Sequence, residues 1–268
     1  YHTAFFSDIQ NFSTFSELLS ATDLVELLNE YLTEHTGVLM QNNGTLDKYI
    51  GDAIVAFFGA PVPVDNHEYF ACLTALQMQS KLAELREYWK SQGDRWPKKV
   101  HEMRCRIGIN SGRMVTGNMG SASRMNYTMM GDTVNIAARL ESSAKQHGIY
   151  IQVGEQTYTA VKDDFEWRFI DLVRVKGKNL PIKVYELLAM KGALDEKTSH
   201  MLSDFNIGIE LYHKQKWDQA LDAFKESAKY EIDFPGKNLN PSLVRIERCK
   251  KLKLNPPGAD WDKVWELV

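Results

Sequence analysis

Hydrophobic side chains recur along the chain with strand spacing and helix spacing in turn, and this order predicts the core of the fold. Residues 1–9 have the pattern of a strand, and apolar side chains then follow at helical spacing from Ser13 to Met40. The runs TLDKYI and AIVAFFG are strand-like and flank Gly51-Asp52, a pair typical of a two-residue hairpin turn. A long helix is predicted from about His67 to Gln92.

The pattern continues in the same way up to about Ala189. The runs MRCRIGINSG and RMVTGNMG are strand-like, and a helix is predicted from about Thr133 to His147. Further strand-like runs follow, with one short helix among them: YIQV, EWRFIDLVRV and IKVYELL. Strands interleaved with long helices, two of the strands in a hairpin, predict an α+β fold with a β-α-β-β-α-β core and its helices packed on one face.

The composition changes near residue 190. The polar run KGALDEKTSH predicts a linker over 190–202, and the chain beyond it, 203–268, is predicted to be helical to the end. The run FNIGIELYHKQKWDQALDAF resembles a tetratricopeptide repeat, with Gly208, Ala220 and Phe224 at the expected offsets. Only about one repeat and a further helix fit, whereas a free-standing solenoid needs about three. We therefore expect this appendage to pack on the main domain, on a second copy or on a partner.

Composition and charge narrow the class of protein. The chain has 268 residues, 44% of them hydrophobic, and a net charge of -3 with both signs interspersed. It therefore has no strongly basic region of the kind that indicates a protein that binds nucleic acid, and no nucleic-acid partner is expected. The longest nearly apolar run, AIVAFFGAPVPV, is too short to span a bilayer, and we expect a cytoplasmic location for this piece of chain. Three widely spaced cysteines, Cys72, Cys105 and Cys249, predict reduced, buried thiols.

The start of the sequence indicates a piece of a longer protein. It opens on Tyr1 without a methionine, and a site-like motif appears within the first eight residues. We expect an upstream regulatory domain outside this sequence.

Two aspartates are predicted to meet at one edge of the sheet. Asp8 ends the first strand and Asp52 lies in the hairpin turn, with no obvious cationic neighbour. Two such carboxylates repel each other unless a cation lies between them, and they suit magnesium or manganese. Exposed N–H groups at the helix start beyond Asp8, near Phe12 and Ser13, would hold a phosphate beside the metal. The alternative is that Asp8 caps a helix and Asp52 is an ordinary turn residue.

Two further stretches carry polar side chains in a suggestive pattern. In YTMMGDTVNIAARLE, Asn135 and Arg139 are four residues apart and so project from one face of a helix. An amide and a guanidinium there could hold a ribose and neutralise charge on phosphorus, or simply form a solvated helix face. In VKGKNLPIKVYEL, Lys176 and Lys178 flank Gly177, where they could meet terminal phosphates or decorate a turn.

Five runs in this order resemble the catalytic domain of the class III nucleotidyl cyclases, the adenylyl and guanylyl cyclases: SDIQNF, LDKYIGDAIVAFFG, RIGINSG, YTMMGDTVNIAARLE and VKGK. The resemblance covers residues 1 to about 189. It implies a ferredoxin-like α+β core, here followed by the small tetratricopeptide-like appendage. It also implies a head-to-tail homodimer with shared active sites, each using metal ligands from one subunit and transition-state residues from the other.

The resemblance assigns roles to single residues. Asp8 and Asp52 match the metal-binding aspartates, with the carbonyl of Ile9 as a further ligand, and two ions of Mg²⁺ or Mn²⁺ per site are implied. One ion would activate the ribose 3'-hydroxyl and the other would hold the β- and γ-phosphates. Asn135 matches the residue that orients the ribose, and Arg139 the residue that stabilises charge at the α-phosphate.

The remaining matches concern the phosphates and the base. Lys176 matches a lysine that binds the terminal phosphates, and Phe12 and Ser13 stand where the family commonly has phenylalanine and threonine. Lys48 and Thr128 match the base-selecting pair. A lysine there is typical of adenylyl cyclases, because it donates to adenine N1 whereas guanine presents a donor at N1. The pair looks like that of the bacterial lysine-threonine subgroup, so the implied substrate is ATP.

Three other functions compete with an adenylyl cyclase that makes 3',5'-cyclic AMP and pyrophosphate. A guanylyl cyclase is disfavoured by Lys48. A non-catalytic nucleotide-binding or scaffold module is disfavoured because the matched catalytic side chains are all present. A diguanylate cyclase is disfavoured because the sequence has no GGDEF-like run.

Overall fold

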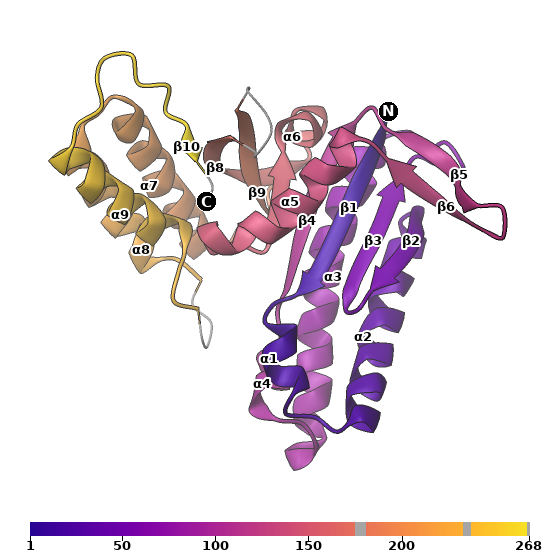
Figure 1. Cartoon of the computed structure of the whole chain (residues 1–268). Helices are drawn as coiled ribbons and strands as arrows, with labels where there is room; N and C mark the ends of the chain where they lie inside the picture. The colour runs from indigo at the N-terminus through magenta and orange to yellow at the C-terminus, as the bar shows by residue number, and fades with distance from the viewer. Residues whose placement is uncertain (175–180, 233–236, 267–268) are drawn as a thin grey trace. The chain divides into compact units, whose positions relative to one another are not determined.

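The computed structural model describes residues 1–174, 181–232 and 237–266 (Figure 1). The chain divides into two compact units. The first comprises Tyr1–Ser142 with Tyr150–Val161, and the second comprises Ser143–Ile149 with Lys162–Val268. Among the described residues, no helix is both long and apolar enough to cross a membrane.

The first unit is built on a sheet whose centre is strand β1. Its strands are β1 (His2–Ile9), β2 (Gly44–Ile50), β3 (Ala53–Phe58), β4 (Cys105–Gly112) and β7 (Ile151–Gly154). They lie in the order β7-β4-β1-β3-β2, with β1 antiparallel to both β3 and β4 and with β7 parallel to β4. The order β4-β1-β3-β2 is that of a ferredoxin-like core, which confirms the predicted α+β fold.

Two long helices cover one face of this sheet. Helices α2 (Ala21–Gln41) and α3 (His67–Ser91) lie side by side behind the strands (Figure 1). Their inward side chains are fully buried, as amphipathic spacing requires: Leu27, Tyr31, Leu39, Ala75, Met78 and Leu82.

The first predicted helix is interrupted. Instead of one helix from Ser13 to Met40, the chain forms a short helix α1 (Phe12–Ser16) and then α2. Ser20 has an extended backbone and its Oγ accepts a hydrogen bond from the N–H of Asp23 at 3.1 Å. Ser20 therefore caps a new helix, because a serine oxygen satisfies an N–H group that lacks an intrahelical partner.

Helix α5 (Asp132–His147) packs on the opposite face from α2 and α3. A cluster of buried side chains joins it to the sheet, including Ala4, Phe57 and Ala137. Gly108 permits this close approach, because a Cβ at this position would lie 2.3 Å from the carbonyl oxygen of Ala137.

Smaller elements complete the first unit. Strands β5 (Val115–Ser121) and β6 (Arg124–Met130) form a two-stranded antiparallel ribbon, of which only β5 was predicted. The short helices are α4 (Lys98–His101) and α6 (Glu155–Val161), with a 3-10 turn at Gly93–Arg95. The cysteines Cys72, Cys105 and Cys249, the last in the second unit, are free and buried, as predicted.

The second unit places helices against a pair of strands. Its elements are β8 (Phe165–Arg174), β9 (Ile182–Met190), α7 (Glu196–His213), α8 (Trp217–Lys229), α9 (Pro241–Leu254) and β10 (Trp265–Glu266). Helices α7 and α8 form a hairpin around Phe205 and Phe224, and Phe169 of β8 packs on this cluster. The C-terminal helices thus share a hydrophobic core with strand β8 of the same unit.

The boundaries of the tail differ from those predicted. Helix α7 begins at Glu196, inside the predicted linker. The tail is not helical to its end, because α9 ends at Leu254 and β10 then pairs parallel to β8. Gly208 faces the ring of Phe224, where a Cβ would come within 2.6 Å of the ring. This close helix contact suits the tetratricopeptide-like spacing, which stays a prediction.

Candidate active site

Asp8 and Asp52 lie together at one end of the central strands. Strand β1 pairs with β3 so that Ser7 is opposite Ile54, which brings the end of β1 beside the β2–β3 turn. Gly51 in that turn has a φ of 64°, which a glycine adopts without strain. The Asp52 side chain is buried, and its Oδ2 accepts a hydrogen bond from the Ile9 N–H at 2.9 Å. The two aspartates and Ile9, far apart in sequence, therefore share one edge.

The carboxylates of Asp8 and Asp52 repel each other at this edge. Burial, followed by the charge of Asp8, raises the pKa of Asp52 to about 6, although the hydrogen bond from Ile9 acts in the opposite direction. The sequence suggested no cationic neighbour, and this was wrong. Arg106 of β4 stands opposite Asp8 in the β1–β4 register, and its Nη2 lies 3.0 Å from Asp8 Oδ2. Arg106 Nε also donates to Glu141 Oε1 at 2.9 Å, so its charge is divided between two carboxylates.

This donor set fits a hard divalent cation. In a strand, the N–H and C=O of one residue point to the same side, so the Ile9 carbonyl points toward the side of Asp52. Two carboxylates and a carbonyl are oxygen ligands of the kind that magnesium prefers. The raised pKa of Asp52 reflects a repulsion that a bound cation would relieve. Among the described residues, no group of three or more His, Cys, Asp or Glu side chains forms a fuller metal cage.

Lys48 and Thr128 also come together, from different strands. Lys48 Nζ of β2 lies 3.5 Å from Thr128 Oγ1 of β6. A third residue, Asp47, joins them: the Thr128 hydroxyl donates to Asp47 Oδ2, and Lys48 Nζ lies 3.3 Å from Asp47 Oδ1. Asp47 was not predicted from the sequence, because its proximity to Thr128 depends on the contact between β2 and β6, which are distant in sequence.

Asn135 and Arg139 are both exposed on α5, on the side of the helix that is turned away from the aspartates. The helix turns Thr133, Ala137 and Glu141 toward β4, since Thr133 O accepts from β4 and Glu141 contacts Arg106. Asn135 and Arg139 lie two residues further along, about 200° around the helix from that face. Within one chain, these two side chains therefore point away from the face that carries Asp8.

The structure describes only some of the residues that were predicted to contact phosphate groups. Helix α1 begins at Phe12, where Asn11 adopts a left-handed backbone with a φ of 58°. Phe12 is half-buried with its ring edge-on to Phe15, and Ser13 is exposed. Lys176 and Lys178 lie outside the described residues.

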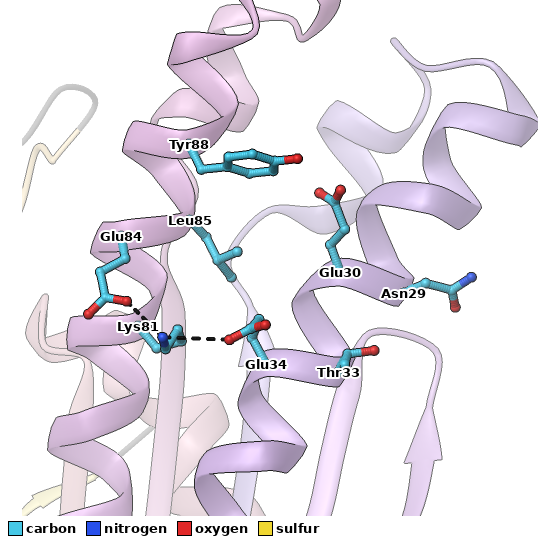
Figure 2. Close-up of a pocket in the computed structure, with 8 residues that line it drawn as sticks. All are labelled: Asn29, Glu30, Thr33, Glu34, Lys81, Glu84, Leu85 and Tyr88. Atoms are coloured by element: carbon cyan, nitrogen blue, oxygen red, sulfur yellow. Dashed lines mark hydrogen bonds and ion pairs between the residues drawn. The ribbon is translucent and has the colours of Figure 1, made fainter.

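A separate hollow of about 580 Å³ opens between α2 and α3. Figure 2 shows its walls, where Glu34 from α2 and Glu84 from α3 flank Lys81. Lys81 Nζ lies 2.7 Å from Glu84 Oε2 and 3.5 Å from Glu34 Oε2. None of the sequence-predicted site residues lines this hollow, so it is distinct from the candidate active site.

Comparison with known proteins agrees with this arrangement. Residues 2–189 match the family described as "Adenylate and Guanylate cyclase catalytic domain". The chain therefore belongs to the adenylate and guanylate cyclase catalytic domain family. Adenylate cyclase 1 of Rhizobium meliloti is 32% identical over 193 residues, which are 72% of this chain and 28% of that protein.

Solved structures of both cyclase types are similar to this chain. The adenylyl cyclase CyaB from P. aeruginosa has 34% identity and a TM-score of 0.64, covering 72% of this chain and 96% of that chain. The guanylate cyclase domain of RhGC from Catenaria anguillulae, in complex with GTP, has 30% identity and a TM-score of 0.60, covering 71% and 97%. The match spans between 11% and 36% of the length of the curated relatives that this chain resembles.

Proposed function

We propose that this chain is the catalytic domain of an adenylyl cyclase that converts ATP to 3',5'-cyclic AMP and pyrophosphate. The observation that carries the choice of ATP is the Lys48–Thr128 contact of 3.5 Å. The Lys48 ammonium can only donate, which suits adenine N1, and the Thr128 oxygen can accept from the 6-amino group. Guanine offers N1–H and O6 at the same positions, so the Lys48 ammonium would face another donor.

The carboxylate edge is the proposed site of two Mg²⁺ or Mn²⁺ ions. Asp8, Asp52 and the Ile9 carbonyl would hold them, and Ile9 N–H keeps the Asp52 carboxylate oriented. Bound there, divalent cations supply Lewis-acid polarisation of the ribose 3'-hydroxyl and of the phosphate oxygens. Arg106 restrains the Asp8 carboxylate from the neighbouring strand.

The remaining residues are proposed to act directly on the nucleotide. Asn135 orients the ribose through its amide, and the Arg139 guanidinium stabilises the negative charge that develops at the α-phosphate. Backbone N–H groups near Phe12 and Ser13 contact the phosphates, and Lys176 binds the terminal ones. Each of these roles requires binding or charge stabilisation rather than a covalent intermediate on the protein.

The same geometry supports a homodimer with shared sites. Because Asn135 and Arg139 point away from the face with Asp8, a site that contains all of them is best completed by a second copy. Large apolar side chains are also exposed on β2 and on the β5–β6 ribbon, which is typical of an interaction surface. They are Tyr49, Ile50, Val115, Met125 and Met130.

A guanylyl cyclase is the second candidate, because the similar solved structures include guanylyl cyclases. Incubation of the protein with manganese and equimolar ATP and GTP, followed by mass spectrometry of the products, separates the two. We expect predominantly cyclic AMP. Predominantly cyclic GMP would overturn the base assignment and keep the chemistry, and the absence of either product from a dimeric protein would overturn the catalytic proposal.

Shared sites predict complementation between inactive variants. Asp52→Ala and Arg139→Ala are each expected to be inactive, and mixing them should restore part of the activity, because one of the two heterodimer sites is then intact. The matched control mixes Asp52→Ala with Asp8→Ala, which damages the same half of both sites and should restore nothing. Failure of the first mixture despite heterodimer formation would contradict shared sites.

A further inference from the structure

Asp47 has an unusual place in strand β2. The strand pairs Leu46 with Ala56 and then Lys48 with Val55, so Asp47 is the extra residue of a β-bulge. In a regular strand, consecutive side chains point to opposite faces, and Asp47 and Lys48 would part. The bulge instead lets both reach Thr128, and the Asp47 side chain is only 2% exposed whereas that of Lys48 is 42% exposed.

The contact between Asp47 and Thr128 fixes the direction of a hydrogen bond. A threonine hydroxyl has one hydrogen, and here it is donated to Asp47 Oδ2. A carboxylate accepts and cannot return a hydrogen. The Thr128 oxygen is left with its acceptor capacity only. Lys48 is held beside the same carboxylate, with Nζ 3.3 Å from Oδ1, and offers only donors.

These two directions match one purine edge and not the other. Adenine presents an acceptor at N1 and a donor in its 6-amino group, whereas guanine presents a donor at N1 and an acceptor at O6. Without Asp47, the Thr128 hydroxyl could rotate and donate to O6, because a hydroxyl serves either role. The residue that removes this freedom therefore contributes to the choice of base without touching it.

We propose that Asp47 is a specificity-determining positioning residue, which takes the Thr128 hydroxyl hydrogen and so commits the base subsite to the 6-amino group of adenine. This inference rests on the proposed function, since it assumes that Lys48 and Thr128 meet the base. It adds the buried residue that sets the direction of their hydrogen bonds.

The test measures base preference in binding and in turnover. Dissociation constants for 3'-deoxyadenosine and 3'-deoxyguanosine triphosphates, which lack the attacking hydroxyl, are compared in manganese buffer, alongside kcat/KM for ATP and GTP. Asp47→Asn keeps the size of the side chain but no longer fixes the direction of the hydrogen bond, because its amide can turn either an acceptor oxygen or an N–H₂ donor toward Thr128. We expect the preference for adenine to fall about tenfold or more, while Asp65→Asn at an exposed site leaves it unchanged.

A double substitution tests whether Asp47 acts through Thr128. In a Thr128→Val background the hydroxyl is absent, so Asp47→Asn should change the adenine preference no further. Asp47→Ala removes the carboxylate without adding a donor, and it replaces Asp47→Asn in these measurements if that variant does not fold.

The outcomes separate the two proposals. An unchanged preference in folded Asp47→Asn and Asp47→Ala, or an equal further loss in the Thr128→Val background, would overturn the role of Asp47 and leave the proposed function standing. A wild-type protein that binds the guanine nucleotide better would overturn the ATP assignment together with the Asp47 inference. Adenine preference in binding that depends on Asp47 would support the inference even if turnover were lacking.

Discussion

Asp52 and Asp171 are both buried aspartates, and their surroundings have opposite signs. Asp52, 9% exposed at the β2–β3 turn, lies beside the carboxylate of Asp8, and burial and this charge raise its pKa to about 6. Asp171, 1% exposed in β8, is contacted by Arg245 Nη2 at 3.0 Å, by Arg248 Nη1 at 2.5 Å and by His147 Nε2 at 3.4 Å.

These surroundings have opposite effects on the proton. Burial alone would raise the pKa of Asp171, but the charge of Arg245, a hydrogen bond from His147 and the charge of Arg248 outweigh it and hold the pKa well below its usual range. Burial alone therefore does not decide the pKa of an aspartate: a neighbouring charge adds to its effect at Asp52, and neighbouring charges outweigh it at Asp171. A carboxylate compensated by opposite charges, as Asp171 is, ties elements together, whereas a pair compensated only in part, as Asp8 and Asp52 are beside Arg106, costs stability and is typical of a binding or catalytic site.

The largest expected effect is on the compensated site. Asp171→Asn leaves the guanidinium groups of Arg245 and Arg248 buried without a counter-charge. Removing one partner of a buried ion pair costs about 3–5 kcal/mol, so the free energy of unfolding from urea titration should fall by that amount. Asp222→Asn, which affects an exposed pair on α8, is the matched control and should have little effect. A loss no greater than that of the control would show that the cluster is not a stabilising anchor.

The site of Asp8 and Asp52, whose repulsion Arg106 offsets only in part, should respond in the opposite way. Asp52→Asn keeps an acceptor for the Ile9 N–H and removes the repulsion with Asp8, so at neutral pH and without metal the variant should be more stable than the wild type. The folded state holds the Asp52 proton up to about pH 6, whereas the ordinary pKa is 3.8. Protonated Asp52 therefore stabilises the folded state fully below pH 3.8. This contribution to the free energy of unfolding, on the order of 2 kcal/mol, is lost as pH rises through 6.

Urea titrations of the two proteins between pH 4 and 8 test this difference. The gap between Asp52→Asn and the wild type should widen with rising pH and narrow when magnesium is added, since a bound cation favours the ionised carboxylate. Cyclase activity of the variant should fall at least about 100-fold, because even residues that only support metal ligands cost 10–100-fold. A variant that loses stability at pH 7 would contradict the repulsion.

The fold was predictable where burial imposes a clear period. Strand β1, the hairpin around Gly51-Asp52 and helix α3 follow the pattern closely, because each buries one face or both. The end of α1 before Ser20 was hidden inside a continuous apolar spacing, since a cap depends on the backbone conformation of a single residue. Strand β6 was missed because most of its side chains are exposed in a two-stranded ribbon and follow no buried alternation.

The site was predictable only as far as local sequence places it. Asp8 and Asp52 follow from a strand end and a turn, which short motifs reveal. Arg106 depends on the register between β1 and β4, which are distant in sequence, and Asp47 depends on a bulge in β2 that turns its side chain and on the contact of β2 with β6. Hydrophobic periodicity predicts neither contact. The one signal in the sequence was that an acidic residue, Asp47, directly precedes Lys48 in the run LDKYIGD.

The smallest effect on stability is expected where opposite charges meet near the solvent, as they do at Lys81. Lys81 lies between Glu34 and Glu84 in the lining of the α2–α3 hollow (Figure 2), and the hydrogen bond with Glu84 raises its pKa. Water screens such pairs, so Lys81→Ala should shift the melting temperature by less than about 2 °C and leave the rate of cyclic nucleotide formation within about twofold. Differential scanning fluorimetry and the cyclase assay measure both. A loss comparable with that of Asp171→Asn would mean that proximity of opposite charges, rather than their burial, governs stability in this protein.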